Sequence, residues 1–139
     1  MAYFGLEFAA AFPADEIERG EGDDWEIVRP GGMAMSIAIV DLLRSIGFPA
    51  TIPEPDLEHY CWVFEVEKGG RHLVCCCYVI PGEPEFIMVQ GSSPMFKRLF
   101  NRPDPYIELL RSLDGLLNGD PRFASVQWID LNRKPIAAL

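Results

Sequence analysis

Basic residues and sequence motifs for known chemistry are both scarce in this chain. It has 12 Lys and Arg residues against 21 Asp and Glu, and only 2 His, which gives a formal net charge of −9. A surface of that sign repels phosphate backbones and anionic lipid headgroups, so neither nucleic acid nor a membrane surface is the expected partner. The sequence has no apolar run of about 18 residues and no basic start followed by an apolar stretch. We therefore expect a cytoplasmic protein.

Spacings that deliver a metal or cofactor site are missing as well. There is no CxxC or HxxxH pair, and the glycines form neither a GxGxxG nor a phosphate-loop pattern. The two histidines, His59 and His72, fall at opposite ends of one predicted strand pair. Cys75, Cys76 and Cys77 are consecutive in an apolar segment, where a thiol stays protonated and packs as a small hydrophobic group. We expect reduced cysteines, no metal, no cofactor and no catalytic residue, that is, a protein that is not an enzyme.

Length and composition are those of one ordinary globular domain. The chain has 139 residues, of which 49% are hydrophobic and 24% charged. A chain of this length buries enough surface to fold without a disulfide or a metal. We therefore treat residues 1–139 as a single domain.

Three consecutive antiparallel strands, a meander, are predicted in the middle of the chain. Residues 60–67 are rich in aromatic and β-branched side chains, and Gly69-Gly70 supplies a two-residue turn. Residues 73–80 form the return strand, the Pro-Gly-Glu-Pro sequence at 81–84 turns the chain again, and residues 85–90 form the third strand.

Two long helices flank the meander. Residues 33–46 have so narrow a polar stripe that this helix is mostly buried, and Gly47 ends it. The second begins with Asp104 as N-cap and Pro105 in the first turn, and it ends at Asn118-Gly119. Further strands are expected at 3–8, 25–28 and 124–131, a short helix at 95–100, an extended connection at 48–55 and a loose tail at 132–139. The fold class is α+β, an antiparallel sheet made of the meander plus edge strands, with two main helices packed on one face.

The turn at Gly69-Gly70 determines which side chains of the meander share a face. It places four pairs opposite one another: Lys68 with Arg71, Val66 with Leu73, Phe64 with Cys75 and Trp62 with Cys77. One face is then wholly apolar and is assigned to the helices: Tyr60, Trp62, Phe64, Val66, Leu73, Cys75, Cys77, Val79, Phe86 and Met88.

The other face of the meander is charged near the turn and apolar at its far end. The charged part holds Glu65, Glu67 and His72, with His72 opposite Glu67 as a cross-strand ion pair. The apolar part consists of Val63, Val74, Cys76, Tyr78, Ile87 and Val89. Two coverings are open: the N-terminal segment with Phe4, Leu6 and Phe8, or another protein chain, since exposed apolar patches mark interaction sites.

Acidic residues are concentrated in the first fifth of the chain. Residues 1–28 hold eight acids and one base, a charge of −7. We expect a solvated loop at 13–24, with one helical turn at 14–19, that attracts a basic protein. The alternative is that the acidity only maintains solubility. The candidate partner-binding residues are Asp15, Glu16, Glu18, Glu21, Asp23, Asp24, Glu65 and Glu67.

Two groups of bacterial proteins resemble this sequence. Phe96–Pro103, Leu116–Phe123 and Val126-Gln127-Trp128 form a pattern found in small uncharacterised bacterial proteins. These residues are caps, turns and core positions, so the resemblance implies a shared fold and carries over no functional residue. The small size, the acidity and the lack of a catalytic motif are similar to those of immunity proteins of bacterial polymorphic toxin systems, which implies an inhibitor that plugs a toxin.

The predicted order of elements also resembles that of acidic type III secretion chaperones, which normally continue with a further strand and helix. The function that we favour is non-catalytic protein binding, as an immunity or antitoxin-like inhibitor that occludes a basic partner. The alternatives are a dimeric chaperone that uses the apolar part of the second meander face, and a small-molecule or enzymatic site between helix and sheet that includes His59, Tyr60 or Asp41.

Overall fold

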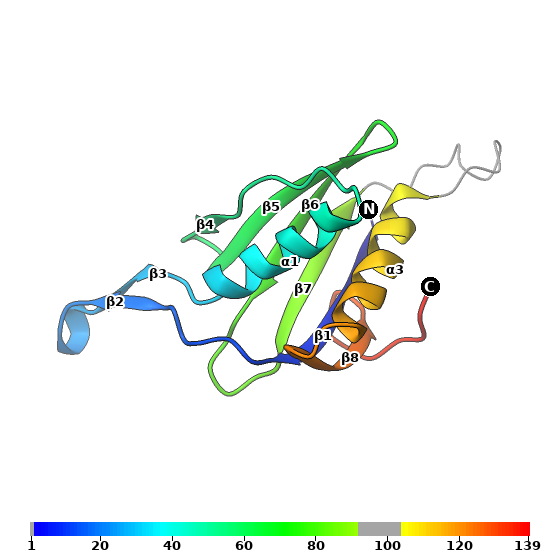
Figure 1. Cartoon of the computed structure of the whole chain (residues 1–139). Coiled ribbons are helices and arrows are strands. Elements are labelled where there is room, and N and C mark those ends of the chain that lie inside the picture. Colours follow the sequence, from blue (N-terminus) through cyan, green and yellow to red (C-terminus); the bar gives the residue numbers. More distant parts are fainter. Residues whose placement is uncertain (1, 92–103) are drawn as a thin grey trace.

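The computed structural model describes residues 2–91 and 104–139 (Figure 1). The predicted α+β class, with a mostly antiparallel sheet and two helices, is confirmed. The helix predicted at 95–100 lies outside the described residues. The helices are α1 (Met33–Ser45) and α3 (Pro105–Asn118), and a short 3₁₀ turn spans Gly22–Asp24. The strands are β1 (Ala2–Ala10), β2 (Ile17–Arg19), β3 (Glu26–Arg29), β4 (Glu54–Asp56), β5 (Cys61–Lys68), β6 (Arg71–Tyr78), β7 (Glu85–Gly91) and β8 (Phe123–Ile129).

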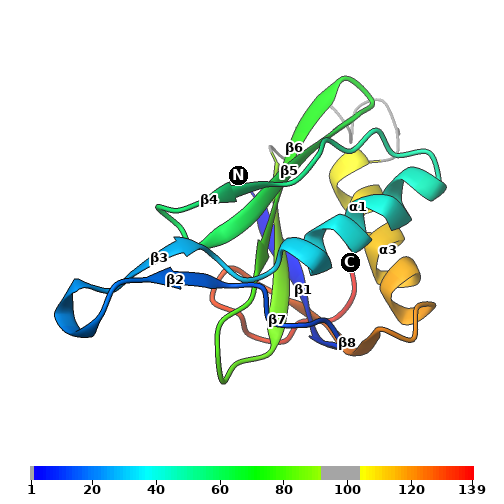
Figure 2. The same cartoon turned by 60° about the vertical axis from the view of Figure 1, so that its left-hand side comes forward.

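Six of the strands form one sheet in the order β4-β5-β6-β7-β1-β8. Each neighbouring pair in it is antiparallel. The N-terminal strand β1 therefore lies inside the sheet, between β7 and β8. Strands β2 and β3 form a separate hairpin that projects from the body of the molecule (Figures 1 and 2).

Both helices cover the same side of the sheet and share one core with it (Figure 2). Asp104 Oδ1 accepts a hydrogen bond of 2.9 Å from the backbone N–H of Tyr106, with Pro105 in the first turn, so the predicted cap of α3 is confirmed. The Tyr106 hydroxyl donates to the Val89 carbonyl at 2.7 Å and accepts from the N–H of Phe4 at 2.7 Å, which connects α3 to β7 and β1.

The register of the β5–β6 hairpin is the one that the sequence predicts, with Lys68 opposite Arg71 and Trp62 opposite Cys77. The prediction for the third strand is wrong by one residue. Cys77 lies opposite Ile87 and Cys75 opposite Val89, so Ile87 and Val89 face the helices and are fully buried in the main core. Because neighbours on a strand point to opposite sides, Phe86 and Met88 move to the open side, which is the side of the sheet away from the helices.

The C-terminal segment covers part of the open side. The loose tail predicted there is wrong: Ile136 N–H donates to the Trp128 carbonyl at 2.9 Å, and Pro135 forms a bridge with Ile129. This turn places the Arg133 guanidinium 4.1 Å from the centroid of the Phe86 ring. The covering predicted from Phe4, Leu6 and Phe8 is wrong as well, because these side chains belong to the helix-side core.

Gly5 of β1 lies opposite Met88 of β7, and it provides a test of the sheet order. A Cβ atom at Gly5 would meet the carbonyl oxygen of Ile87 and lie 2.7 Å from Met88 Sδ. We expect Gly5→Ala to lower the free energy of unfolding by about 1 to 3 kcal/mol, measured by urea denaturation. In Gly115→Ala the new Cβ meets nothing within 4 Å on α3, and we expect a gain of about 0.4 to 1 kcal/mol. Equal stability of both variants would contradict the strand arrangement.

Candidate functional site

The acidic segment predicted as a loop with a helical turn is instead the hairpin β2–β3. Arg19 lies opposite Glu26 and Ile17 opposite Arg29. The tip is closed at Gly20, which has a φ of 99° and whose Cβ, if present, would meet the carbonyl of Asp24. Only glycine adopts this conformation without strain, so the glycine at position 20 is what allows the chain to turn here.

Carboxylates and two large apolar side chains share the surface of this hairpin. Trp25 is 54% exposed and Ile17 is 44% exposed. In the part of the chain that the structure describes, no Lys, Arg or His forms an ion pair with the hairpin carboxylates. Burial and the neighbouring carboxylate of Glu18 raise the pKa of Glu16. The exposed acidic residues are Glu18, Glu21, Asp23, Asp24 and Glu26, and Glu16 is half-buried.

The carboxylate of Asp15, one of the predicted partner-binding residues, accepts hydrogen bonds at the start of α1. Its Oδ1 accepts from the N–H of Gly32 at 2.6 Å, and its Oδ2 accepts from the N–H of Ala34 at 2.7 Å. The N-cap position itself is Gly32, which has no side chain for the purpose. Arg29 donates from Nε and Nη2 to the Asp15 carbonyl at 3.1 and 2.9 Å, which joins the two ends of the hairpin at its base.

Glu65 and Glu67 lie on β5 beside the imidazole of His72. His72 Nε2 is 3.1 Å from Glu65 Oε1, and Nδ1 is 3.5 Å from Glu67 Oε1. The predicted cross-strand pair of His72 and Glu67 is confirmed, and Glu65 is the nearer partner. Glu67 stands next to the β5–β6 turn, which points away from the β2–β3 hairpin in both views (Figures 1 and 2), so it does not join the acidic hairpin.

Only four of the six residues predicted as an apolar interface lie on the open side. Val63, Val74 and Tyr78 are half-buried there and Cys76 is buried, whereas Ile87 and Val89 lie in the core. The four line a shallow cavity of about 200 Å³ together with Asp56, His59, Cys61 and Gln90. With part of the face covered by the C-terminal turn, the remaining apolar area offers less to a dimeric chaperone than the sequence suggests.

The cysteines have the properties of packed thiols. Burial raises the pKa values of Cys75 and Cys77, which keeps both protonated at neutral pH. The hydrogen bond between Cys61 and Cys76 raises the pKa of Cys61, with burial adding to the shift, and the same bond lowers the pKa of Cys76.

The residues named for a small-molecule site are dispersed. Asp41 is exposed on α1, Tyr60 is 55% exposed in the turn before β5, and His59 borders the cavity on the open side. Within residues 2–91 and 104–139, no three His, Cys, Asp or Glu side chains are grouped so as to hold a metal ion. Over the same ranges, no helix has the length and apolar character required to cross a membrane.

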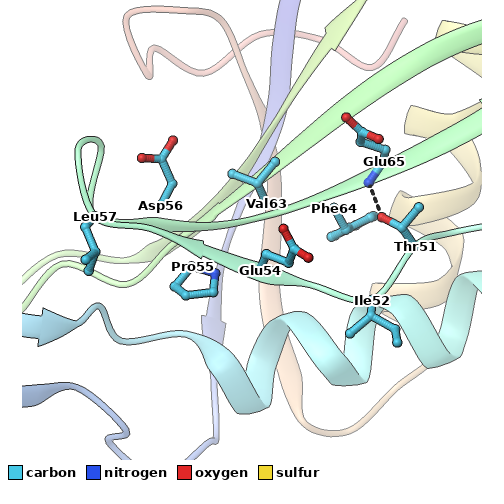
Figure 3. Close-up of a pocket in the computed structure, with 9 residues that line it drawn as sticks. All are labelled: Thr51, Ile52, Glu54, Pro55, Asp56, Leu57, Val63, Phe64 and Glu65. Atoms are coloured by element: carbon cyan, nitrogen blue, oxygen red, sulfur yellow. Dashed lines mark hydrogen bonds between the residues drawn. The ribbon is translucent and has the colours of Figure 1, made fainter.

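A groove along β4 is the feature that the sequence prediction missed. It has a volume of about 740 Å³ and contains the carboxylates of Glu54, Asp56 and Glu65 (Figure 3). Its other lining residues are Thr51, Ile52, Pro55, Leu57, Val63 and Phe64. A signal for it was present in the sequence, because residues 51–67 hold five acids and no Lys or Arg. The prediction took residues 48–55 only as an extended connection, whereas Glu54–Asp56 pair with β5 as an edge strand.

Comparison with known proteins gives no relative. No family model, no curated protein and no solved structure matches this chain. Its function must therefore be argued from its own surface, which offers the acidic hairpin, the groove along β4 and the partly covered open side.

Asp15 and Asp23 form a matched pair of acidic residues in the same segment. We expect Asp15→Ala to lower the free energy of unfolding by about 1 to 2 kcal/mol, because two N–H groups of the first turn of α1 lose their acceptor. Asp23→Ala removes an exposed carboxylate, so the change should stay within about 0.5 kcal/mol. Urea denaturation measures both. Equal effects would show that Asp15 does not cap α1.

The pKa of His72 tests the pairing on β5. Its hydrogen bond to Glu65 raises this pKa above the ordinary imidazole value of about 6.5. Because the folded-state pKa is raised, the stabilisation is fully present below about pH 6.5 and is lost as the pH rises through the raised pKa. In an NMR titration of the imidazole protons, Glu65→Gln should lower the pKa of His72 and leave that of His59, which pairs with Asp56, unchanged. If the pKa of His72 is the same in Glu65→Gln as in the wild type, the pairing of His72 with Glu65 is contradicted.

Proposed function

We propose that this chain is a non-catalytic protein-binding domain that uses its projecting acidic hairpin to bind a basic partner protein. The observation that carries the proposal is the combination of two exposed apolar side chains, Trp25 and Ile17, with carboxylates that no cation neutralises within the described residues. Exposed tryptophan is costly in water and is enriched among the residues that dominate binding energy in interfaces. The surrounding negative charge speeds the encounter with a positively charged surface.

Within this class we favour an immunity or antitoxin-like inhibitor that works in the cytoplasm. The hairpin extends beyond the body of the molecule, so it can enter a concave site that a flat surface cannot reach (Figures 1 and 2). Its base is held by Asp15 and Arg29, so part of the ordering cost of binding is already met in the free protein. Occupation of a basic cleft by this hairpin would exclude the cleft's own anionic substrate.

The proposal is tested with the partner that co-purifies with the tagged chain at low salt. After that protein is identified and purified, biolayer interferometry measures the rate at which it associates with the wild-type chain and with a hairpin variant. We expect the rate to fall by about tenfold or more at low ionic strength and the difference to shrink at high salt. The hairpin variant is Glu18→Gln, Glu21→Gln and Asp24→Asn.

A control variant removes the same amount of charge from the two helices. It carries Asp41→Asn, Glu108→Gln and Asp114→Asn, and we expect it to associate at nearly the wild-type rate. If both variants slow association equally, net charge alone is responsible and the hairpin has no special role. If neither variant slows association, or if no stoichiometric partner co-purifies, the proposal is wrong.

A further inference from the structure

Hydrogen bonds hold the chain at both ends of the groove along β4. Arg44 of α1 donates from Nε and Nη2 to the Ala50 carbonyl at 2.9 and 2.8 Å. Thr51 N–H then donates to the Glu65 carbonyl at 2.9 Å. At the other end, Asp56 Oδ1 accepts from the N–H groups of Glu58 and His59 at 3.0 and 3.2 Å. The walls of the groove are therefore preorganised, which lowers the entropy cost of binding.

The two sides of the groove differ in chemistry. Figure 3 shows Ile52 and Leu57 pointing to the side of α1, and the carboxylates of Asp56 and Glu65 pointing to the opposite side of the strands. Ile52 is 74% exposed and Leu57 is 50% exposed, so both apolar groups are available to a partner. An extended peptide laid along β4 presents successive side chains to opposite sides, with a period of two. Such a peptide matches the groove if apolar and cationic side chains alternate.

The negative charge of the groove favours a bound peptide that carries Arg or Lys side chains. Residues 51–67 hold five acidic residues and no Lys or Arg. Glu54 has no ion-pair partner among the described residues, whereas Glu65 is paired with His72 and Asp56 with His59. Arg and Lys also carry apolar stems that pack on side chains such as Pro55. An anionic or purely apolar occupant would cover the carboxylate of Glu54 without giving it a partner.

The backbone at this edge of the sheet has few free N–H groups, so a bound peptide would contact the groove mainly through side chains. Glu65 N–H already donates to Thr51 Oγ1 at 2.9 Å, so this donor of β5 is occupied. On β4, Glu54 pairs with Val63 and Asp56 pairs with Cys61 of β5. Pro55 lies between Glu54 and Asp56, and its backbone faces outward, away from β5. Proline has no N–H to donate to an added strand, and Pro53 lacks one as well. A metal ion is not the occupant that the groove fits, since no three suitable ligands are grouped within the described ranges.

We propose that this groove is a second contact for the basic partner and that it takes an extended segment in which apolar and basic residues alternate. The inference rests on the proposed function, and the position of the groove supports it. The hairpin and β4 lie at the same end of the molecule in both views (Figures 1 and 2). The Trp62 indole N–H, on the strand beside β4, donates to the Pro30 carbonyl at the base of the hairpin at 2.8 Å. One partner can therefore contact both surfaces.

The test uses two synthetic peptides of the same composition. One is acetyl-Leu-Arg-Leu-Arg-Leu-Arg-amide, and the other has three Leu followed by three Arg. The ¹⁵N-labelled full chain is titrated with each, and amide shifts are followed in residues 51–57, in residues 63–65 and in the hairpin. We expect the alternating peptide to shift the groove signals with an affinity about fivefold higher than that of the block peptide. Ile52→Ser and Glu54→Gln should each weaken that binding, whereas Ile80→Ser, which alters an exposed residue elsewhere, should not.

The outcomes separate this inference from the proposed function. If the hairpin signals shift while the groove signals do not, the groove proposal is wrong and hairpin binding stands. If the groove responds equally to both peptides and Ile52→Ser has no effect, the binding is only electrostatic and the alternating segment is ruled out. If neither region responds, the groove proposal fails and basic-partner binding by the hairpin loses its support as well.

Discussion

The carboxylate of Asp15 is the contact on which the proposed binding surface depends. It accepts hydrogen bonds from the N–H groups of Gly32 and Ala34, so it caps α1. The backbone carbonyl of Asp15 accepts hydrogen bonds from the guanidinium of Arg29, at the far end of the hairpin. One residue thus completes the first turn of a core helix and closes the base of the projecting hairpin. Free N–H groups at a helix start require an acceptor, and here the loop that carries the acidic residues supplies it. Helix and hairpin are therefore stabilised together.

The negative charge of the chain is concentrated in two segments of the sequence, and the fold places parts of both at the same end of the molecule. Residues 1–28 carry −7 and residues 51–67 carry −5, so the remaining residues carry a net charge of +3. The first segment includes most of the hairpin and the second includes β4, and these two elements lie at one end of the molecule (Figure 1). Like charges held close together in the free protein raise its energy, and a basic partner relieves that repulsion. Acidity that served only solubility would not require this clustering.

Local patterns predicted those parts of the fold that short-range chemistry determines. The Gly69-Gly70 turn leaves one register for its hairpin, and Asp104-Pro105 marks the start of α3. The connection at 79–84 has no such fixed geometry, so the register of β7 was wrong by one residue and two core side chains were assigned to the surface. The role of Asp15 depends on N–H groups 17 and 19 residues away, which no local pattern reveals. The acidity of residues 51–67 was visible, but only the pairing of β4 with β5 turns it into a groove.

Hydrogen–deuterium exchange of the chain, alone and in complex with its co-purified basic partner, tests the central claim most directly. The account predicts slower exchange in the complex for residues 16–29, with a second protected region at 51–57 and little change in α3. Protection limited to α1 and α3 or to the open side of the sheet, with the hairpin exchanging as fast as in the free protein, would contradict it.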